Sequence, residues 1–282
     1  MDLTPPARDA LLRRALDARA AGESLLRAAP IAPAEAHRRQ WAELAVLLDE
    51  LSSAEWLAVT SMDVTVHELV AHLAAQQRWI ARSLFKAGHF VPPPGTEGDH
   101  WGLSWPTIER LRALPTYATV AELASAVSLV IDVAAVTTDE RWARGAPPLG
   151  DVFAARTFEL WIHTDDIRRA TGRPFVDPDV PRLDRLCRLA ASFTPFGMEI
   201  VGTARADRTM RLVLTGVGGG TWVQPLGMAT PAGDADVTVV ADGARFCRVA
   251  GKLLDADELN AHVEGDATLV AGIVAGARAF AE

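Results

Sequence analysis

One stretch of the chain places four ionisable residues at helical spacing: Arg156, Glu159, His163 and Asp166. At 100° per residue they fall within an arc of about 80° on one side of a helix. The rest of this helix is largely apolar, and such a stripe is costly unless its groups pair or hold a metal ion. Glu159 and His163, four residues apart, lie one above the other. One carboxylate and one imidazole make up half of a zinc or ferrous site.

The same spacing is also typical of a solvated, salt-bridged helix face, with Arg156–Glu159 and Glu159–His163 as its pairs. A metal site therefore needs a further ligand from another segment. The helix expected from Thr65 onward offers His67 and His72. These residues point about 140° apart and cannot share one ion.

Periodicity does not choose between the two histidines, because each flanks the apolar stripe of its helix. His72 shares its flank with Gln76 and Trp79, which favours a second contact surface there. His67 lies in the first helical turn, where a side chain is more often exposed. The choice stays open at this point, with a preference for His72.

The remaining histidines give weaker evidence for a functional site. His37 and His262 are expected on the surface of helices, and His89 and His100 in a loop from His89 to Tyr117. The glycine run Gly216–Gly220 is expected to be a hairpin turn, because no Gly-Lys-Ser/Thr follows it and a strand does. The sequence contains no nucleophile-elbow motif, so it does not indicate catalysis by a serine nucleophile.

The elements that must position these residues are helices over the first 170 residues. Two capping boxes, Thr65–Glu68 and Thr119–Glu122, mark helix starts. A further helix is expected to begin at the cap Asp151 and to end at Gly172. Helices are also expected over residues 4–27 and 33–51. Long amphipathic helices of this kind predict a four-helix bundle.

The pattern changes after Pro174. A helix fits residues 182–193, and strands 210–214 and 221–223 form a hairpin across the glycine run. A strand over 236–240 and helices over 243–253 and 267–281 follow. The fold class is therefore α+β, mainly α, with a helical bundle over 1–175 and a small α+β domain over 176–282.

Composition excludes several classes of function. The net charge of −8 disfavours duplex nucleic acid, which needs a basic surface. The longest apolar stretch, Leu123–Val136, contains Asp132 and is too short to span a bilayer, and no signal peptide is evident. Cys187 and Cys247 are expected to be reduced core thiols. We expect a cytoplasmic protein, monomeric or homodimeric, with a small-molecule partner and neither nucleic acid nor membrane.

Two segments resemble a known family. Val66–Leu73 resembles the second-helix motif of the DinB-like bundle, in which the histidine of Ala-His-Leu is a metal ligand. Phe158–Pro174 resembles the Glu-x-x-x-His helix of actinobacterial mycothiol-dependent maleylpyruvate isomerase-like proteins. Arg211–Gly216 and Val263–Asp266 resemble the C-terminal domain of that family, which is similar to sterol-carrier folds. Arginine makes up nearly all of the basic residues, a bias that also fits an actinobacterial genome.

The resemblance implies a metal triad of His72, Glu159 and His163 that binds zinc or another divalent ion. It thereby selects His72 over His67. It also implies mycothiol as the thiol cosubstrate, which a bound ion would convert to thiolate at neutral pH. Arg156 and Asp166, on the same arc, are candidates for supporting the ligands or contacting the substrate.

The chain departs from the family at two points. Asp63-Val64 stands where the family usually has Gly-Trp before the second helix, which concerns packing more than the metal. The family also uses an arginine of its C-terminal domain near the site. Arg248 is the candidate here, with Lys252 as the alternative, and no catalytic residue is assigned.

Three functions follow as hypotheses. The first is a metal-dependent mycothiol transferase or cis–trans isomerase acting on a small electrophile. The second keeps the metal but activates water or a substrate without thiol, as in a hydrolase or a natural-product tailoring enzyme. The third is a non-catalytic protein that binds a small molecule, with the polar stripe serving structure alone.

Overall fold

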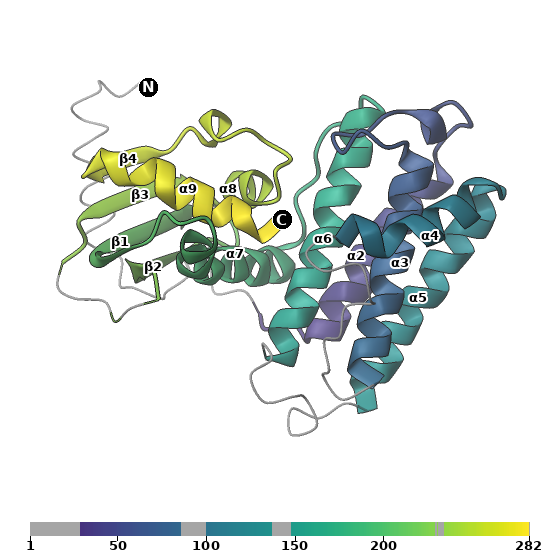
Figure 1. The fold of residues 1–282 in the computed structure, drawn as a ribbon, viewed down its shortest axis with the longest axis horizontal. Helices are drawn as coiled ribbons and strands as arrows, with labels where there is room; N and C mark the ends of the chain where they lie inside the picture. Colours follow the sequence, from purple (N-terminus) through teal and green to yellow (C-terminus); the bar gives the residue numbers. More distant parts are fainter. Residues whose placement is uncertain (1–28, 86–99, 137–147, 229, 231–233, 282) are drawn as a thin grey trace. The chain divides into compact units, whose positions relative to one another are not determined.

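The computed structural model describes residues 29–85, 100–136, 148–228, 230 and 234–281. Their contacts separate a helical unit, Ile31–Pro178, from a unit that runs over Asp179–Glu282 (Figure 1). The fold class is α+β and mainly helical, which confirms the prediction. The helix expected over residues 4–27 lies outside the described residues, so the extent of a domain over 1–175 stays a prediction.

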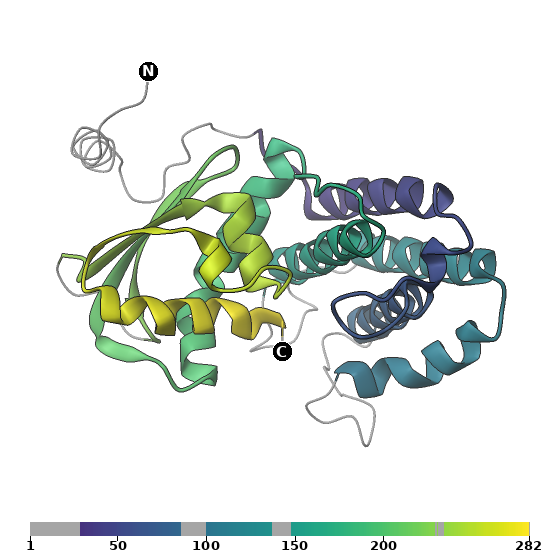
Figure 2. The same cartoon turned by 90° about the horizontal axis from the view of Figure 1, so that it is seen from above.

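The helical unit is built around four long helices that run side by side (Figures 1 and 2). Helices α2 and α3 each pack against both α5 and α6, while α2 hardly contacts α3. This is the predicted four-helix bundle, with α2 and α3 on opposite corners, and a further helix, α4, packs on α3. The bounds are α2 Pro33–Asp49, α3 Val66–Phe85, α4 His100–Arg112, α5 Thr116–Val136 and α6 Leu149–Ala170, with a 3-10 turn at Glu55–Leu57.

The bundle core consists of two apolar clusters with polar side chains between them. One cluster contains Leu44, Leu69 and Leu160, and the other contains Ile80 and Phe153. Buried polar residues stand at this level on three of the helices: Gln76 and Gln77 lie between Ala74 and Ile80 on α3, and Thr157 lies between Phe153 and Leu160 on α6. His37 and Gln40 precede Leu44 on α2, and His72 lies one turn before Gln76. A polar layer therefore divides the core of the bundle.

The start of α3 is the predicted capping box. The backbone N–H of Glu68 donates to Thr65 Oγ1 (3.2 Å), and that of Thr65 donates to Glu68 Oε2 (2.9 Å). These two bonds satisfy backbone donors that the first helical turn leaves without partners. The helix that carries His72 therefore begins where the sequence indicated.

The prediction of a second capping box at Thr119–Glu122 is wrong. Helix α5 begins one turn earlier, at Thr116, directly after Pro115, whose fixed φ suits a helix start. Thr119 is buried inside the helix, with its Oγ1 2.7 Å from His67 Nε2. Glu122 forms ion pairs with two arginines of α3 and α4 instead.

The loop expected from His89 to Tyr117 is also corrected. Helix α4 occupies most of its second half, and Pro106 lies inside that helix. The content of proline and tryptophan obscured its helical pattern. Ser104 of α4 accepts a hydrogen bond from Gln76 of α3 (3.3 Å). Residues 89–99, including His89, lie outside the described part of the chain.

The second unit is a four-stranded sheet with helices. The predicted hairpin of β1 and β2 is antiparallel, with Leu214 opposite Gly220, and β3 is parallel to β1. Strand β4 was not predicted, and its residue His262 is half-buried on a strand, where a surface helix was expected. The order is β2-β1-β3-β4. The bounds are α7 Val180–Ile200, β1 Arg205–Thr215, β2 Gly220–Leu226, β3 Val237–Asp242, α8 Gly243–Ala250, β4 His262–Gly265 and α9 Val270–Arg278, with 3-10 turns at Asp257–Leu259, Ala267–Leu269 and Ala279–Ala281.

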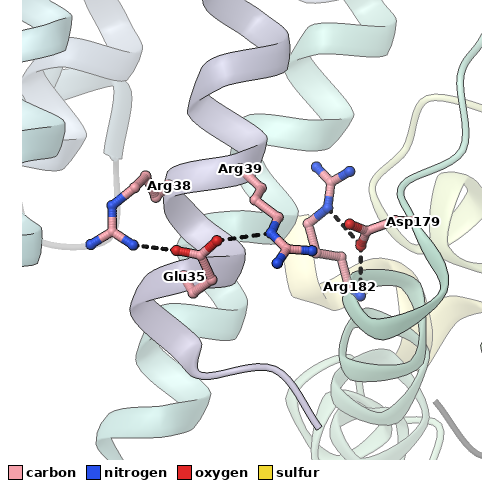
Figure 3. Close-up of polar contacts among 5 residues, drawn as sticks. All are labelled: Glu35, Arg38, Arg39, Asp179 and Arg182. Atoms are coloured by element: carbon pink, nitrogen blue, oxygen red, sulfur yellow. Dashed lines mark hydrogen bonds and ion pairs between the residues drawn. The ribbon is translucent and has the colours of Figure 1, made fainter. Parts of the chain in front are cut away.

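Local ion pairs stabilise the first turn of one helix in each unit (Figure 3). In α2, Glu35 pairs with Arg38 and with Arg39, whose Nε lies 2.9 Å away. In α7, Asp179 is the N-cap and accepts from both the backbone N–H (3.2 Å) and the Nε (2.9 Å) of Arg182. Negative charge at a helix N-terminus is favourable, so both carboxylates stand where helix starts prefer them.

The two cysteines are free and buried, which confirms the prediction of core thiols. Cys187 of α7 and Cys247 of α8 lie with their Sγ atoms 3.8 Å apart. The contact with Cys247 and burial raise the pKa of the Cys187 thiol well above its usual range. In the described part of the chain, no helix is long and apolar enough to cross a membrane.

Helices α7 and α9 approach each other closely at Gly197 and Gly276. A Cβ added to Gly197 would lie 2.0 Å from the backbone oxygen of Gly276. That oxygen cannot move without shifting α9, so Gly197→Ala should lower the free energy of unfolding by about 1–3 kcal/mol. Urea denaturation of the variant checks this. Gly172→Ala is a control for the loss of glycine alone, since its added Cβ meets nothing within 4 Å, although its φ of +70° adds local strain.

Candidate metal centre

Three side chains from two helices of the bundle converge. Helix α3 contributes His72, and α6 contributes Glu159 and His163. One potential ligand atom of each residue lies within 4.8 Å of those of the other two. His72 Nε2 is 3.7 Å from Glu159 Oε1, and the two imidazole rings stand edge to face with their centroids 5.7 Å apart. Among the residues that the structure describes, this is the one such group of three.

The site is shielded from solvent and carries a fixed negative charge. The side chain of His72 is 2% exposed and that of Glu159 is 15% exposed. Burial alone would raise the pKa of Glu159, but the Arg156 guanidinium and the two histidines lower it to about 2. Arg156 Nη1 donates to Glu159 Oε2 at 2.6 Å. Glu159 is therefore a carboxylate at neutral pH.

These three residues fit a divalent metal ion. Ligand bonds of about 2.1 Å in tetrahedral geometry place ligand atoms roughly 3.4 Å apart, close to the 3.7 Å between His72 and Glu159. Two imidazoles and one carboxylate are the donors of many catalytic zinc sites and of ferrous sites. Three protein ligands also leave positions for a substrate or a thiol, as a catalytic site requires.

The structure brings His72, and not His67, to the pair on α6. His67 lies at the start of α3, where its Nε2 faces Thr119 of α5 and its ring stands edge to face with Trp56. Periodicity left both histidines open because both flank the same apolar stripe. Helix α6 packs on the flank of α3 that carries His72, and this packing places His72 beside Glu159 and His163.

The other candidate residues from the sequence, Arg156, Asp166 and Arg248, lie in three different environments. Asp166 is buried, and its two carboxylate oxygens accept from the backbone N–H and the hydroxyl of Ser61, in the segment before α3. Arg156 contacts the triad directly through Glu159, whereas Asp166 binds the chain ahead of the helix that carries His72. Arg248 lies on α8 of the second unit and is largely buried. Roles for these three residues in binding or catalysis stay predictions.

Sequence reasoning missed His37. It is completely buried in α2, although a surface position was expected. The spacing of His37 from the apolar residues of α2 could have indicated that it is buried. Successive steps of three, four and three residues separate His37, Gln40, Leu44 and Leu47. That is the spacing of one buried helix face. His37 therefore belongs to the same polar layer as His72.

Comparisons with known proteins agree with this fold. The family model described as the mycothiol maleylpyruvate isomerase N-terminal domain matches residues 37–168. Two crystal structures of the mycothiol-dependent maleylpyruvate isomerase, one of them of a histidine-to-alanine mutant, are each 19% identical to this chain. Each alignment covers 78% of this chain and 88% of the other, with a TM-score of 0.55, and this likeness shows a shared fold.

No curated protein matches the chain by sequence. The family match nevertheless spans α3, α4 and α5, most of α2 and α6, and all three residues of the triad. Within the helical unit, residues 37–168 are therefore similar to the mycothiol maleylpyruvate isomerase N-terminal domain.

Proposed function

We propose that this chain is a metal-dependent enzyme that uses mycothiol to isomerise a small electrophilic substrate or to transfer the thiol to it. Maleylpyruvate is the first substrate to test, because the solved relatives are named for it. The isomerisation would proceed by addition of the thiol across a carbon–carbon double bond, rotation about the resulting single bond, and elimination of the thiol. The observation that carries the proposal is the convergence of His72, Glu159 and His163.

A divalent ion, zinc in our proposal, would lower the pKa of a bound thiol so that thiolate forms at neutral pH. The chain supplies the conditions for this. His72 and His163 offer imidazole nitrogens from two helices, and Glu159 adds one negative charge. Arg156 keeps that carboxylate ionised and restricts its orientation through the 2.6 Å hydrogen bond.

We place the enzyme in the cytoplasm, as a monomer or homodimer without nucleic-acid partners. Free, buried cysteines support a reducing compartment. The net charge of −8 supports the absence of a nucleic-acid partner.

The test begins with metal content per chain, measured on untagged protein purified without chelator. About one divalent ion per chain is expected. Cobalt is then substituted and mycothiol titrated, and a new sulfur-to-cobalt charge-transfer band should appear in the near-ultraviolet. Turnover of maleylpyruvate with and without mycothiol completes the test.

Each outcome discriminates between functions. Metal with the sulfur band supports the thiol-dependent enzyme. Metal without the band would point to a hydrolase or tailoring enzyme that activates water or its substrate. No metal, and none taken up on titration, would overturn the enzyme proposal and leave a small-molecule-binding bundle.

A further inference from the structure

The polar layer of the bundle contains a second set of residues that join three helices beside the triad. His37 Nε2 of α2 lies 3.1 Å from Gln77 Oε1 of α3, and His37 Nδ1 lies 3.4 Å from Thr157 Oγ1 of α6. All three side chains are completely buried. The ring of His37 also stands edge to face with Phe153, at a centroid distance of 6.0 Å.

The direction of these hydrogen bonds follows from the donors available. The amide oxygen of Gln77 can only accept, so His37 Nε2 carries the proton and donates to it. The lone pair of Nδ1 then faces the hydroxyl of Thr157, whose single proton can point to Nδ1 (3.4 Å) or to the backbone oxygen of Phe153 (2.8 Å), one at a time. A neutral imidazole donates to Gln77 and accepts from Thr157 when that hydroxyl points to Nδ1. Burial lowers the pKa of His37 to about 4, which agrees with a neutral ring.

These contacts reach both helices that hold the candidate ligands. Gln77 stands five residues after His72 on α3, and Thr157 stands two residues before Glu159 on α6. These separations correspond to about 7.5 Å and 3 Å along the helix axes. Helix α2 packs on α6 but hardly on α3, so the bond from His37 to Gln77 spans a corner-to-corner gap that backbone packing does not close.

We propose that His37 is a positioning residue for the metal site, which sets the spacing of α3 and α6 through Gln77 and Thr157. A leucine at this position would fill the same space but could hold neither helix in register. A buried hydrogen bond is directional, and neither partner can leave it without losing a bond that water cannot replace. This inference rests on metal binding as proposed above.

The test measures zinc affinity by competition with a chromophoric chelator and ligand geometry from the d–d spectrum of the cobalt protein. His37→Phe keeps an aromatic ring without either hydrogen bond and should weaken zinc binding by about 10–100-fold, as loss of a residue that orients a ligand does. The intensity and position of the cobalt bands should change with it. Gln77→Met, which removes the other end of the same bond, should have a similar effect.

Two further variants separate positioning from general stability. Leu44→Ala removes core packing from α2 seven residues away and should lower the melting temperature while leaving zinc affinity within about threefold. His37→Gln can renew the bond to Gln77 and should recover most of the affinity. The double variant His37→Phe with Gln77→Met should lose no more affinity than His37→Phe alone, because the histidine variant already removes the contact that Gln77→Met removes.

The outcomes distinguish this inference from the proposed function. Metal binding by the wild-type chain with unchanged affinity and cobalt spectrum in His37→Phe and Gln77→Met would overturn the positioning role alone. A loss in Leu44→Ala as large as in His37→Phe would do the same. Absence of metal binding in the wild-type chain would overturn both.

Discussion

Replacing Glu159 by glutamine is expected to weaken zinc binding by at least about 100-fold. The substitution keeps the shape of the side chain but removes the one anionic donor from the triad. Loss of a group that only orients a ligand already costs about 10–100-fold, so loss of the ligand itself should cost more. His72→Ala and His163→Ala should behave alike, and each variant should lose the thiol-dependent reaction.

Two matched variants serve as controls. Glu122→Gln makes the same chemical change at a carboxylate that pairs with Arg78 and Arg110 rather than with the triad. His67→Ala removes the other histidine of α3, which faces Thr119. Both should retain about one ion per chain.

The measurement is zinc content after dialysis against a known free-zinc concentration, together with the shift in melting temperature that zinc produces. Zinc should raise the melting temperature of the wild-type chain and of both controls, since an ion that binds only the folded state stabilises it. It should have little effect on the three triad variants. Full zinc loading of Glu159→Gln or His163→Ala, or loss of zinc from His67→Ala, would show that the triad is assigned wrongly.

The parts of the site that depend on local spacing could be predicted from the sequence. Glu159 and His163 share one helix, so their four-residue separation is enough to place them on one face. The start of α3 follows from a capping box that involves only Thr65 and Glu68. The hairpin of β1 and β2 likewise follows from alternation on both sides of a glycine run.

The parts of the site and fold that depend on tertiary packing could not be predicted from the sequence. Periodicity shows that His67 and His72 flank an apolar stripe, but it does not show which flank α6 covers. For His37, a polar residue on the buried face of α2, only partners from α3 and α6 make burial tolerable. Strand β4 is four residues long and pairs with a strand more than twenty residues earlier, so no local pattern marks it. The resemblance to a family supplied the choice of His72 that periodicity left open.

Lowering the pH from 7 to 4 is expected to remove about 3 kcal/mol of stability through His37 alone, when metal is kept away by a chelator. Burial lowers the pKa of His37 in the folded chain to about 4 from an ordinary value of 6.5. Each unit of difference corresponds to about 1.4 kcal/mol, and the difference is about 2.5 units.

The sign follows from which state binds the proton. Between pH 6.5 and pH 4 the unfolded chain protonates this histidine while the folded chain keeps it neutral, so protons favour unfolding. The stabilising contribution is complete above pH 6.5 and is lost as the pH falls to 4. Burial also lowers the pKa of His67, which adds to the effect in the same direction. Glu159, with a pKa of about 2, titrates in the folded chain below this window.

Urea denaturation at intervals between pH 7 and pH 4 measures this dependence, and His37→Phe supplies the comparison. The variant is expected to be less stable than the wild-type chain at pH 7, because it lacks the bonds to Gln77 and Thr157. Its stability should nevertheless fall less steeply with acid, so that the two curves converge towards pH 4. Parallel curves would mean that His37 takes up its proton as readily in the folded chain as in the unfolded one, which a neutral ring enclosed by three helices does not allow.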